Sequence, residues 1–350
     1  MKIAINGEYL CKPLTGTQRY AFEIMREIDQ LCNKGEILLL VPSFAREVPE
    51  YENIKVVRVP SLIKSSFFWI QTSLPFYLKR NKMKCIHLCN FVPFIKPDVV
   101  CLHDICHKVN PWLHSSFKER IVSQVVKINY RIATRKSIHI FTVSNFSKQQ
   151  IAENYGVKKD KISLLSPGWQ HMQRLVEDES IIDLFPELKK PYFFTLGSIS
   201  KRKNISWVIE VARAHPQYIF AISGNQLPLQ SKQVELENVP DNVKLLGKMN
   251  DEQMKYVMHH CKAFLFPSFY EGFGLPPLEA LSLGRPIIVA DRASIPEIYG
   301  KCAYYVNPEQ TSINLDEILK ETTQSPEEVI NKYSWRKTAQ KLYEFMHDYS

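Results

Sequence analysis

The feature that most constrains the fold of this chain is an alternation of short apolar runs with amphipathic segments. In the first half, the apolar runs have the length of buried strands: Ile3–Asn6, Ile37–Val41, Ile54–Val59, Val99–Leu102 and Ile138–Val143. The segments between them place apolar residues three and four positions apart: Tyr20, Ile24, Ile28 and Leu31, and then Ile121, Val125, Ile128 and Ile132. Strands that alternate with helices in this way predict a parallel, doubly wound sheet.

The same alternation restarts after Pro191, which predicts a second α/β sheet. Its expected strands are Tyr192–Leu196, Tyr218–Ser223, Val243–Leu246, Ala263–Phe266, Ile287–Ala290 and Ala303–Val306. A chain of 350 residues exceeds what one core usually supports, so two domains are expected. We predict a first domain over 1–168, a linker over the polar and acidic stretch 169–190, a second domain over 191–332 and a C-terminal helix over 333–350.

One loop of the second half carries the strongest chemical signal. The segment Phe266–Ala280 ends an expected strand, passes through Gly274 and opens a helix. Pro276 and Pro277 suit the first helical turn, where a missing amide hydrogen costs nothing. The remaining free amides, with a glycine that allows close approach, predict an anion site that a diphosphate would fit.

Two glutamates, Glu271 and Glu279, bracket this loop with seven residues between them. Phosphate would repel both carboxylates unless they faced uncharged hydroxyls, and sugar and ribose hydroxyls are such partners. Alternatively, Glu279 complements a helix dipole in the first turn and Glu271 caps a turn, each worth under about 1 kcal/mol. Taken singly, the two residues fit this second interpretation.

Taken together, these residues resemble the donor-binding signature of glycosyltransferase family 4. That family carries two glutamates at this separation around a loop similar to Gly272–Pro276, and the continuation from Gly284 to Asp291 is also similar. The resemblance implies that Glu271 lies against the donor sugar as a catalytic residue and that Glu279 holds the ribose hydroxyls. It also implies that Gly274 and Leu275 contact the donor diphosphate.

A basic cluster, Lys201-Arg202-Lys203, follows the first expected strand of the second half. Alone, such a triplet is usually a solvated turn. In the family, a glycine and a basic pair at this place bind the diphosphate, so the resemblance implies that role for Arg202 and Lys203. The chain departs from many relatives by Ser-Lys before Arg202 and by Ser198, where some relatives carry an arginine.

The first half contributes two further elements of the resemblance. The loop Thr15–Tyr20 is similar to a glycine-rich family element that faces the donor, although Gln18 replaces the second glycine. The resemblance therefore implies that Gly16 and Thr17 contact the donor diphosphate. At the end of an expected strand, His103 could donate a hydrogen bond to a developing charge or a sugar hydroxyl, or serve a structural role. The family has a His-Asp pair here, so the resemblance implies that His103 lies near the sugar as a catalytic residue and that Asp104 is a further candidate for a sugar or acceptor contact.

Composition limits the compartment and the partners. No apolar run approaches the roughly 18 residues that span a bilayer, and no signal peptide is visible, so a cytoplasmic protein is expected. The eight cysteines are expected to be free thiols, because the chain is long and has no visible export signal. The spacings of cysteines and histidines over Cys85–His107 match no zinc motif, so zinc is not expected there. The formal charge of +9 without a nucleic-acid signature is compatible with a nucleotide diphosphate and an anionic lipid leaflet.

The aromatic and basic stretch 67–84 has two interpretations. It could bind an anionic membrane from the inner face, or form a partly buried helix with a solvated lysine face. The region of about 45–95, where the family resemblance is weakest, is where the acceptor is expected to bind.

The resemblance covers nearly the whole chain and implies a GT-B fold, with two Rossmann-like domains whose parallel sheets face a central cleft. The C-terminal helix is expected to return to the first, acceptor-binding domain. The implied reaction transfers a hexosyl unit, with mannose preferred, from a nucleotide diphosphate sugar to a glycan or lipid-linked hydroxyl acceptor, with retention. With no Asp-x-Asp pair, neither a metal nor a cofactor is expected. A nucleotide-sugar epimerase or hydrolase, and a non-catalytic binding module, remain alternatives.

Overall fold

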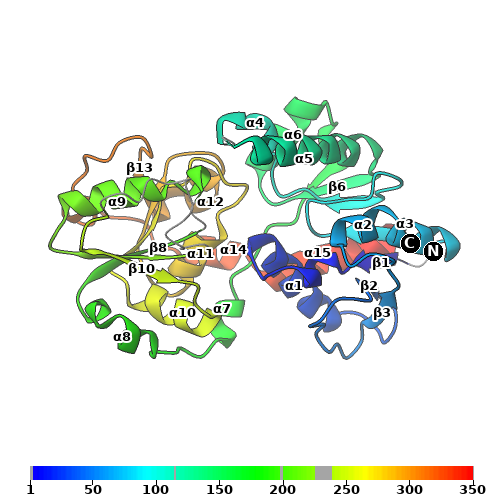
Figure 1. Cartoon of the computed structure of the whole chain (residues 1–350), viewed down its shortest axis with the longest axis horizontal. Helices are drawn as coiled ribbons and strands as arrows, with labels where there is room; N and C mark the ends of the chain where they lie inside the picture. Colours follow the sequence, from blue (N-terminus) through cyan, green and yellow to red (C-terminus); the bar gives the residue numbers. More distant parts are fainter. Residues whose placement is uncertain (1–2, 114–115, 198–199, 225–238, 350) are drawn as a thin grey trace. The chain divides into compact units, whose positions relative to one another are not determined.

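The protein divides into two compact units, which are described separately. A computed structural model of the chain describes residues 3–113, 116–197, 200–224 and 239–349. The first unit comprises Met1–Gly168 with Ser334–Ser350, and the second comprises Trp169–Tyr333 (Figure 1). The chain therefore leaves the first unit, forms the whole second unit and then returns to the first.

The described residues of the first unit form a seven-stranded parallel sheet in the order β3-β2-β1-β4-β5-β6-β7. Its strands are β1 (Ile3–Asn6), β2 (Leu38–Pro42), β3 (Lys55–Val59), β4 (Lys84–His87), β5 (Val99–Cys101), β6 (His139–Thr142) and β7 (Ile162–Leu164). Five of these seven were expected from the sequence. Strands β4 and β7 were missed because neither presents an apolar run of its own.

Helices cover both faces of this sheet. One face packs against α2 (Ser66–Gln71), α3 (Ser73–Arg80), α4 (Cys106–Val109), α5 (Phe117–Lys136) and α6 (Asn145–Tyr155). The other face is covered by α1 (Gly16–Asp29) and α15 (Trp335–Tyr349), which lie side by side in Figure 1. The ring of Phe345 in α15 packs 4.9 Å from that of Phe141 in β6, so the last helix completes the core of the first unit.

Helix α5 presents its apolar stripe to solvent rather than to the sheet. Of the predicted stripe, Ile121, Val125 and Ile128 are 51%, 36% and 54% exposed. The sheet-facing side is formed by Ser123, Asn129, Tyr130, Ala133 and Thr134, which are buried. Two of these polar side chains are hydrogen bonded: Asn129 Nδ2 donates to the carbonyl of Val92 at 2.9 Å, and Thr134 Oγ1 donates to that of Tyr130 at 2.8 Å. The fourth residue of the predicted stripe, Ile132, is partly buried and packs against the core of this unit.

The stretch 67–84 shows features of both of its interpretations. Trp69, Leu74 and Leu78 are buried under the sheet edge in α2 and α3. Phe68 and Phe76 are instead 48% and 68% exposed on the outside of the same helices. No helix in the described part of the chain is both long and apolar enough to cross a membrane.

The second unit contains a six-stranded parallel sheet in its described residues, ordered β10-β9-β8-β11-β12-β13. Its strands are β8 (Tyr192–Leu196), β9 (Ile219–Ser223), β10 (Val243–Gly247), β11 (Ala263–Phe266), β12 (Ile287–Ala290) and β13 (Tyr304–Val306). All six were expected from the sequence. Four of them, β8, β9, β11 and β12, are almost wholly buried and are marked by apolar runs, as strands covered on both faces are. The fold is thus two Rossmann-like units, as expected.

The helices of the second unit include two, α7 and α8, from the segment that was expected to be a linker. They are α7 (His171–Arg174), α8 (Ile181–Leu184), α9 (Ile205–Ala214), α10 (Asp251–His260), α11 (Leu275–Ser282), α12 (Ile295–Tyr299), α13 (Leu315–Ile318) and α14 (Glu327–Lys332). The core lies between α9 and the sheet, where Trp207, Phe193 and Phe220 are buried.

Residues 169–190 group with the second unit, whereas we expected them to form a linker. The amide of Asp178 donates to the carbonyl of Glu252, and Lys255 Nζ donates to that of Leu175 at 2.8 Å. The acidic run thus lies along α10, and Glu177 contacts two histidines at its end.

Candidate functional site

A basic turn and a glycine-containing loop of the second unit are joined by one asparagine. Residues Lys201–Lys203 form a short 3₁₀ turn, and Asn204 follows in a left-handed conformation with φ +54. Its side-chain amide donates to the carbonyl of Pro267 at 3.2 Å and to that of Pro308 at 2.7 Å. Asn204 therefore holds the basic turn beside the loop that follows β11. Ser198 lies outside the described residues.

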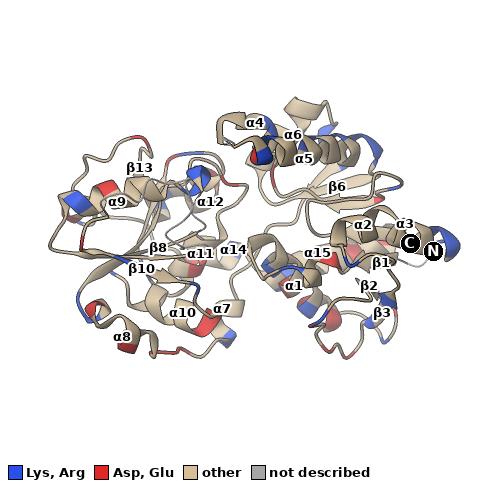
Figure 2. Ribbon diagram, viewed as in Figure 1, with Lys and Arg blue, Asp and Glu red and all other residues tan. Residues whose placement is uncertain are grey.

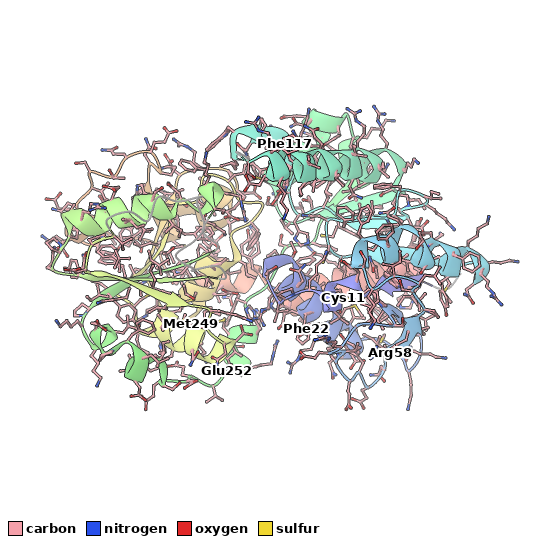
Figure 3. All side chains as sticks on the ribbon, viewed as in Figure 1. Cys11, Phe22, Arg58, Phe117, Met249 and Glu252 are labelled. Atoms are coloured by element: carbon pink, nitrogen blue, oxygen red, sulfur yellow. The ribbon has the colours of Figure 1, made fainter. Side chains whose placement is uncertain are left out.

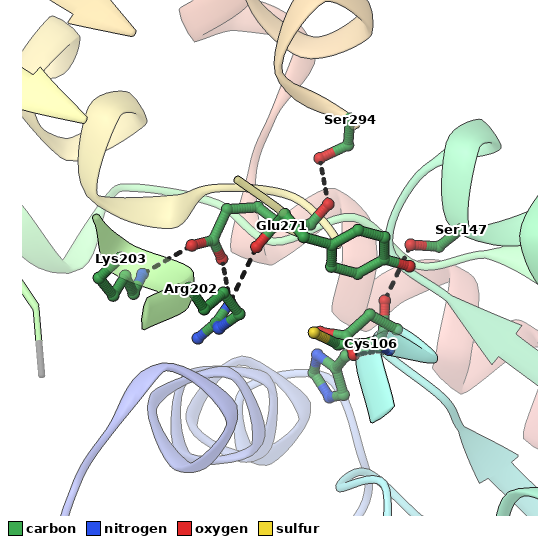
Figure 4. Close-up of polar contacts among 9 residues, drawn as sticks. Cys106, Ser147, Arg202, Lys203, Glu271 and Ser294 are labelled. Atoms are coloured by element: carbon green, nitrogen blue, oxygen red, sulfur yellow. Dashed lines mark hydrogen bonds and ion pairs between the residues drawn. The ribbon is translucent and has the colours of Figure 1, made fainter. Parts of the chain in front are cut away.

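Glu271 is the centre of a buried ion cluster. Its Oε2 accepts from Arg202 Nη1 at 2.7 Å and its Oε1 accepts from Lys203 Nζ at 2.8 Å (Figure 4). Only 7% of Glu271 is exposed, so both contacts are largely shielded from water. Sequence reasoning named these three residues from separate motifs, and the fold brings them together.

The side chain of Lys203 lies between a glycine, Gly197, and the aromatic ring of Phe266. A side chain at Gly197 would meet Lys203 Cγ at 3.1 Å, so the glycine provides the space in which the lysine stem lies. The ammonium group lies 4.6 Å from the centre of the Phe266 ring, a distance that allows a cation–π attraction. Lys203 is therefore held in one place before any ligand binds.

The cluster stays charged at neutral pH. Burial raises the pKa of the Glu271 carboxyl, but Arg202 and Lys203 lower it more, and the resulting pKa is below its ordinary value of 4.5. One carboxylate against two cations leaves a formal charge of +1 in a mostly buried position. Such a position suits an anionic ligand better than a neutral one.

The N-terminus of α11 has the geometry expected from its sequence. Gly274 precedes the helix with φ +90, a conformation that disfavours other residues, and prolines occupy the first turn. The hydroxyl of Tyr299 donates to the carbonyl of Gly274, and Ser294 Oγ donates to that of Glu271 at 2.9 Å. The loop from Glu271 to Leu275 is thus fixed at both ends by α12 and its cap.

Glu279 has a partner that sequence reasoning missed. It is the fifth residue of α11, so the alternative in which it complements the dipole from the first turn is wrong. Its Oε1 lies 2.9 Å from Nε2 of His171, and both residues are buried. His171 was hidden by its place in the expected linker, and no periodicity or motif marks it. An imidazole N–H donated to the carboxylate fixes the side chain of Glu279.

In the first unit, Gly16 and Thr17 open helix α1. Gly16 is exposed, and a side chain added there would meet no atom within 4 Å. The carbonyl of Thr17 accepts from the Cys89 thiol, and Gln18 takes hydrogen bonds from the hydroxyls of Thr15 and Thr17. The open helix N-terminus suits an anion, although the diphosphate role of these two residues stays a prediction.

His103 and Asp104 follow β5. The ring of His103 is buried, and its Nε2 lies 2.9 Å from the carbonyl of Leu88, to which it must donate. Burial lowers the pKa of His103 below its ordinary value of 6.5, so the neutral ring offers Nδ1 as an acceptor. A sugar hydroxyl would therefore donate to His103, the reverse of the expected direction. Asp104 Oδ1 accepts from the amide of Cys106 at 2.9 Å and shapes the start of α4.

The described residues contain one group whose ligand atoms are close enough to share a cation. It consists of Glu177, His259 and His260, far along the chain from the cysteines and histidines of 85–107. Glu177 Oε1 lies 2.7 Å from His259 Nδ1, and Oε2 lies 3.1 Å from His260 Nε2. These contacts join the start of the 169–190 segment to the end of α10.

Comparison with known sequences decides the family. The sequence model of Glycosyltransferase Family 4 matches residues 14–170, and that of Glycosyl transferases group 1 matches residues 176–337. The two matches meet at the junction of the two units. The chain is a group 1, family 4 glycosyltransferase. Among curated proteins this glycosyltransferase is similar to the O-antigen chain mannosyltransferase B of Escherichia coli, with 26% identity over 97% of this chain and 93% of the relative.

Solved structures show that the glycosyltransferase has the GT-B fold. Sucrose-phosphate synthase of Thermosynechococcus elongatus superimposes with a TM-score of 0.75 over 99% of both chains, at 14% identity. HepE of Anabaena, in complex with UDP and glucose, superimposes with a TM-score of 0.71 over 99% of this chain and 100% of that one, at 15% identity. At these identities the likeness concerns the fold.

Proposed function

We propose that this enzyme transfers a hexosyl unit, with mannose preferred, from a nucleotide diphosphate sugar to a hydroxyl of a glycan or lipid-linked acceptor. We further propose that it retains the anomeric configuration and uses no metal. The observation that carries the proposal is the buried cluster in which Arg202 Nη1 and Lys203 Nζ converge on Glu271. A pair of fixed cations beside a helix N-terminus supplies the charge that a departing diphosphate needs.

The chemistry of transfer follows from this arrangement. As the bond between the anomeric carbon and the phosphate oxygen breaks, negative charge grows on the diphosphate and positive charge on the sugar. The negative charge on the diphosphate is stabilised by Arg202, Lys203 and the amides near Leu275. The positive charge on the sugar is faced by the ionised carboxylate of Glu271. The acceptor oxygen bonds to the anomeric carbon on the same face, and its proton passes to an oxygen of the leaving diphosphate.

The positions of the other residues fit the same ligand. Glu279, fixed by His171, is proposed to accept hydrogen bonds from the ribose hydroxyls of the donor. Gly16 and Thr17 are proposed to contact the diphosphate, with His103 and Asp104 on the sugar or acceptor.

The nature of donor and acceptor is supported by the relatives. The Escherichia coli relative is named for mannose transfer to an O-antigen chain, which supports mannose and a surface polysaccharide precursor. The Anabaena structure contains UDP and glucose, which supports a nucleotide diphosphate donor. If the acceptor is lipid-linked, the enzyme works at a membrane surface, and we propose a cytoplasmic enzyme at the inner membrane face.

Donor binding tests the proposed cluster directly. Lys203→Met removes one cation, while Lys201→Met removes an exposed lysine of the same turn and serves as the matched control. We expect GDP-mannose or a UDP-sugar to raise the melting temperature of the parent and of Lys201→Met but not of Lys203→Met. Equal shifts in melting temperature in all three proteins would show that the cluster is not part of the donor site.

Product analysis tests the reaction. With the donor that gives the largest shift and a lipid-linked glycan acceptor, NMR of the new linkage should show the anomeric configuration of the donor. An inverted linkage would refute retention. Release of an epimerised or free sugar without any acceptor would replace transfer by epimerisation or hydrolysis, and binding without turnover of any donor would indicate a binding module.

A further inference from the structure

The group of Glu177, His259 and His260 is a feature of the second unit that the proposed function leaves unused. Each residue offers one ligand atom, and the three atoms lie within 4.8 Å of one another. Two imidazole nitrogens and one carboxylate oxygen are ligands that Zn²⁺ accepts in proteins. The residue types therefore match a metal site, and the surroundings of the group show how an ion would be held.

Helix α10 presents both histidines from its last turn. Val257 and Met258 are fully buried, so the end of the helix is fixed against the core of the second unit. The ring of Tyr256 lies 4.3 Å from that of His260 and supports it from the preceding turn. The side chains of His259 and His260 are 40% and 48% exposed. Both imidazoles thus lie on a rigid element and are open to an ion from solvent.

The backbone on both sides of Glu177 is held against α10 by contacts that do not involve its side chain. Lys255 Nζ donates to the carbonyl of Leu175 at 2.8 Å. The amide of Asp178 donates to the carbonyl of Glu252, which Figure 3 labels near the start of the helix. Because these two contacts fix the position from which the carboxylate extends, an ion that binds here has little to order.

The chain beside the group is acidic. Four further carboxylates follow Glu177 directly or open α10, as Figure 2 shows by colour: Asp178, Glu179, Asp251 and Glu252. Lys255 adds one positive charge, and its ammonium group is directed to a backbone carbonyl. A local excess of negative charge raises the concentration of cations near the surface. The surroundings therefore favour a divalent cation over an anion.

The group lies at the edge of the sheet opposite to the proposed donor cluster. Helix α10 ends at His260 and β11 begins at Ala263, so the histidines lie near the start of this strand. The loop that carries Glu271 follows the end of the same strand. The strands of the second sheet are parallel, so the two ends of β11 lie at opposite edges. An ion held here would not contact the departing diphosphate, and the site is compatible with transfer that needs no metal.

We propose that Glu177, His259 and His260 bind one Zn²⁺ ion, with water as the fourth ligand. Bonds of roughly 2.0–2.2 Å place the ligand atoms of a tetrahedral zinc site about 3.3 Å apart. The contacts of 2.7 and 3.1 Å from the carboxylate to the imidazoles therefore widen slightly when the ion enters, which small rotations of partly exposed side chains allow. His259 coordinates through Nδ1 and His260 through Nε2, each as the neutral tautomer whose other nitrogen carries the proton.

The ion acts as a clamp between the segment 175–184 and α10. Exposed contacts between a carboxylate and imidazoles add little stability by themselves. Coordination joins the same groups through the metal, and an ion that binds only the closed segment stabilises the closed form by mass action. The inference goes beyond the proposed function, since it needs neither donor nor acceptor.

Titration calorimetry of the full chain tests the site. After removal of metals with EDTA, and with the thiols kept reduced, the parent should bind one Zn²⁺ with a dissociation constant on the order of 1 µM, weaker than closed four-ligand sites. Mg²⁺ should give no measurable binding, because it prefers oxygen ligands. Binding of Zn²⁺ weaker than about 0.1 mM would make the group an ion pair only and overturn the proposal.

Matched variants locate the ion. Glu177→Gln and His259→Ala each remove one ligand and should weaken Zn²⁺ binding at least about tenfold. The control His347→Gln changes an exposed histidine of the first unit whose Nε2 lies 3.1 Å from Glu36 Oε1, and it should bind Zn²⁺ as the parent does. Parental affinity in both ligand variants would refute the site. Melting without metal shows that each variant is folded.

The visible absorption of bound Co²⁺ identifies the ligand atoms, since Co²⁺ accepts the same ligands. A site of nitrogen and oxygen ligands gives no thiolate charge-transfer band. Such a band would place the ion on cysteines and overturn the assignment.

Hydrogen exchange tests the clamp. Saturating Zn²⁺ should slow exchange over residues 175–184 in the parent but not in Glu177→Gln. Exchange that Zn²⁺ leaves unchanged in the parent would refute the clamp.

Discussion

In the first unit, lysines and arginines lie on the outside beside exposed apolar side chains, whereas in the second unit the functional cations turn inward onto Glu271. The sequence of the first unit holds 28 Lys and Arg against 15 Asp and Glu, a formal charge of +13. The second unit holds 17 against 21, a formal charge of −4. The total of +9 therefore describes neither unit.

This difference separates two ways of using charge. The net charge of the second unit would repel a diphosphate, so the recognition that we propose there depends on the local positions of Arg202 and Lys203 beside the buried Glu271. The first unit has no comparable buried cluster in its described residues, and its many cations are exposed. Spread over a surface, they favour a large, flat and anionic partner over a small ligand.

The largest effect is expected from Glu271→Gln, which tests whether the inward cluster of the second unit is catalytic. The amide keeps the shape but removes the charge that we propose to face the sugar, so turnover should fall by roughly 10²–10³-fold, a size typical of a lost electrostatic contact at the reacting centre. Steady-state rates with donor and acceptor measure it, and Glu309→Gln, an exposed change in the same unit, is the control. Near-parental turnover would make the cluster merely structural.

Gly274→Ala should have the next largest effect, on the stability of the second unit. A side chain there would meet Ile295 Cδ1 at 2.6 Å while φ is +90, so the free energy of unfolding should fall by about 3 kcal/mol. Gly284→Ala has a similar positive φ of +71 but open space, and should cost only about 1 kcal/mol. Urea unfolding measures both.

Ile295→Val, which removes the Cδ1 atom, should recover part of the loss in the Gly274→Ala background. If it recovers nothing, the steric explanation is wrong and strain in the backbone accounts for the whole effect.

A pH change should distinguish the units. Burial lowers the pKa of His87 to about 3, whereas an unfolded histidine has a pKa near 6.5. Between these values the unfolded state binds a proton that the folded first unit does not, so stability falls as the pH falls. From pH 7 to pH 5 the loss from this residue should be about 2 kcal/mol. Glu271 has a lowered pKa and contributes only as the pH falls below about 4.5.

Hydrogen exchange, corrected for the intrinsic effect of pH, measures the loss of stability of each unit between pH 7 and pH 5. Peptides covering β4 report on the first unit, and peptides covering β11 report on the second. The variant His87→Gln cannot take up the proton but keeps an acceptor for Asn6, whose Nδ2 lies 3.0 Å from His87 Nδ1. Its first unit should lose less stability between pH 7 and pH 5 than the parent. An unchanged slope would assign the acid sensitivity to another group.

The smallest effect is expected from the exposed contacts between Glu177 and the two histidines at the end of α10. Replacing His259 and His260 by alanine removes both contacts to Glu177, which are 40% and 48% exposed on the histidine side. The second unit should lose no more than about 1 kcal/mol. Faster hydrogen exchange confined to residues 175–184 would show that these contacts hold the segment. Unchanged exchange would show that it behaves as a linker.

The sequence predicted the second unit better than the first for a physical reason. Strands buried on both faces read as apolar runs, as at Phe264 and Ile288, and all six were found. In the first unit, β4 has Lys84 and His87 at its ends, and it is a strand because its neighbours β1 and β5 pair with it. Pairing of this kind is not visible in a local pattern.

The candidate site also depends on contacts that a local sequence pattern does not reveal. The motifs named Arg202, Lys203, Glu271 and Glu279, but their mutual contacts depend on residues far apart in sequence. Asn204 holds two loops together through carbonyls, and His171 meets a glutamate 108 positions away. Neither residue has a recognisable spacing. The outward direction of the apolar stripe of α5 also required the fold, because periodicity identifies an apolar side of a helix but not what it faces.

The return of the chain at Ser334 has a consequence for biosynthesis. The rings of Tyr20 and Trp335 pack 5.9 Å apart, and Trp335 and Leu342 are fully buried in the first unit. A ribosome must therefore add the whole of Trp169–Tyr333 before the first unit can receive its last helix. During that interval the nascent first unit exposes the apolar surface that α15 will cover, and exposed surface of this kind favours aggregation.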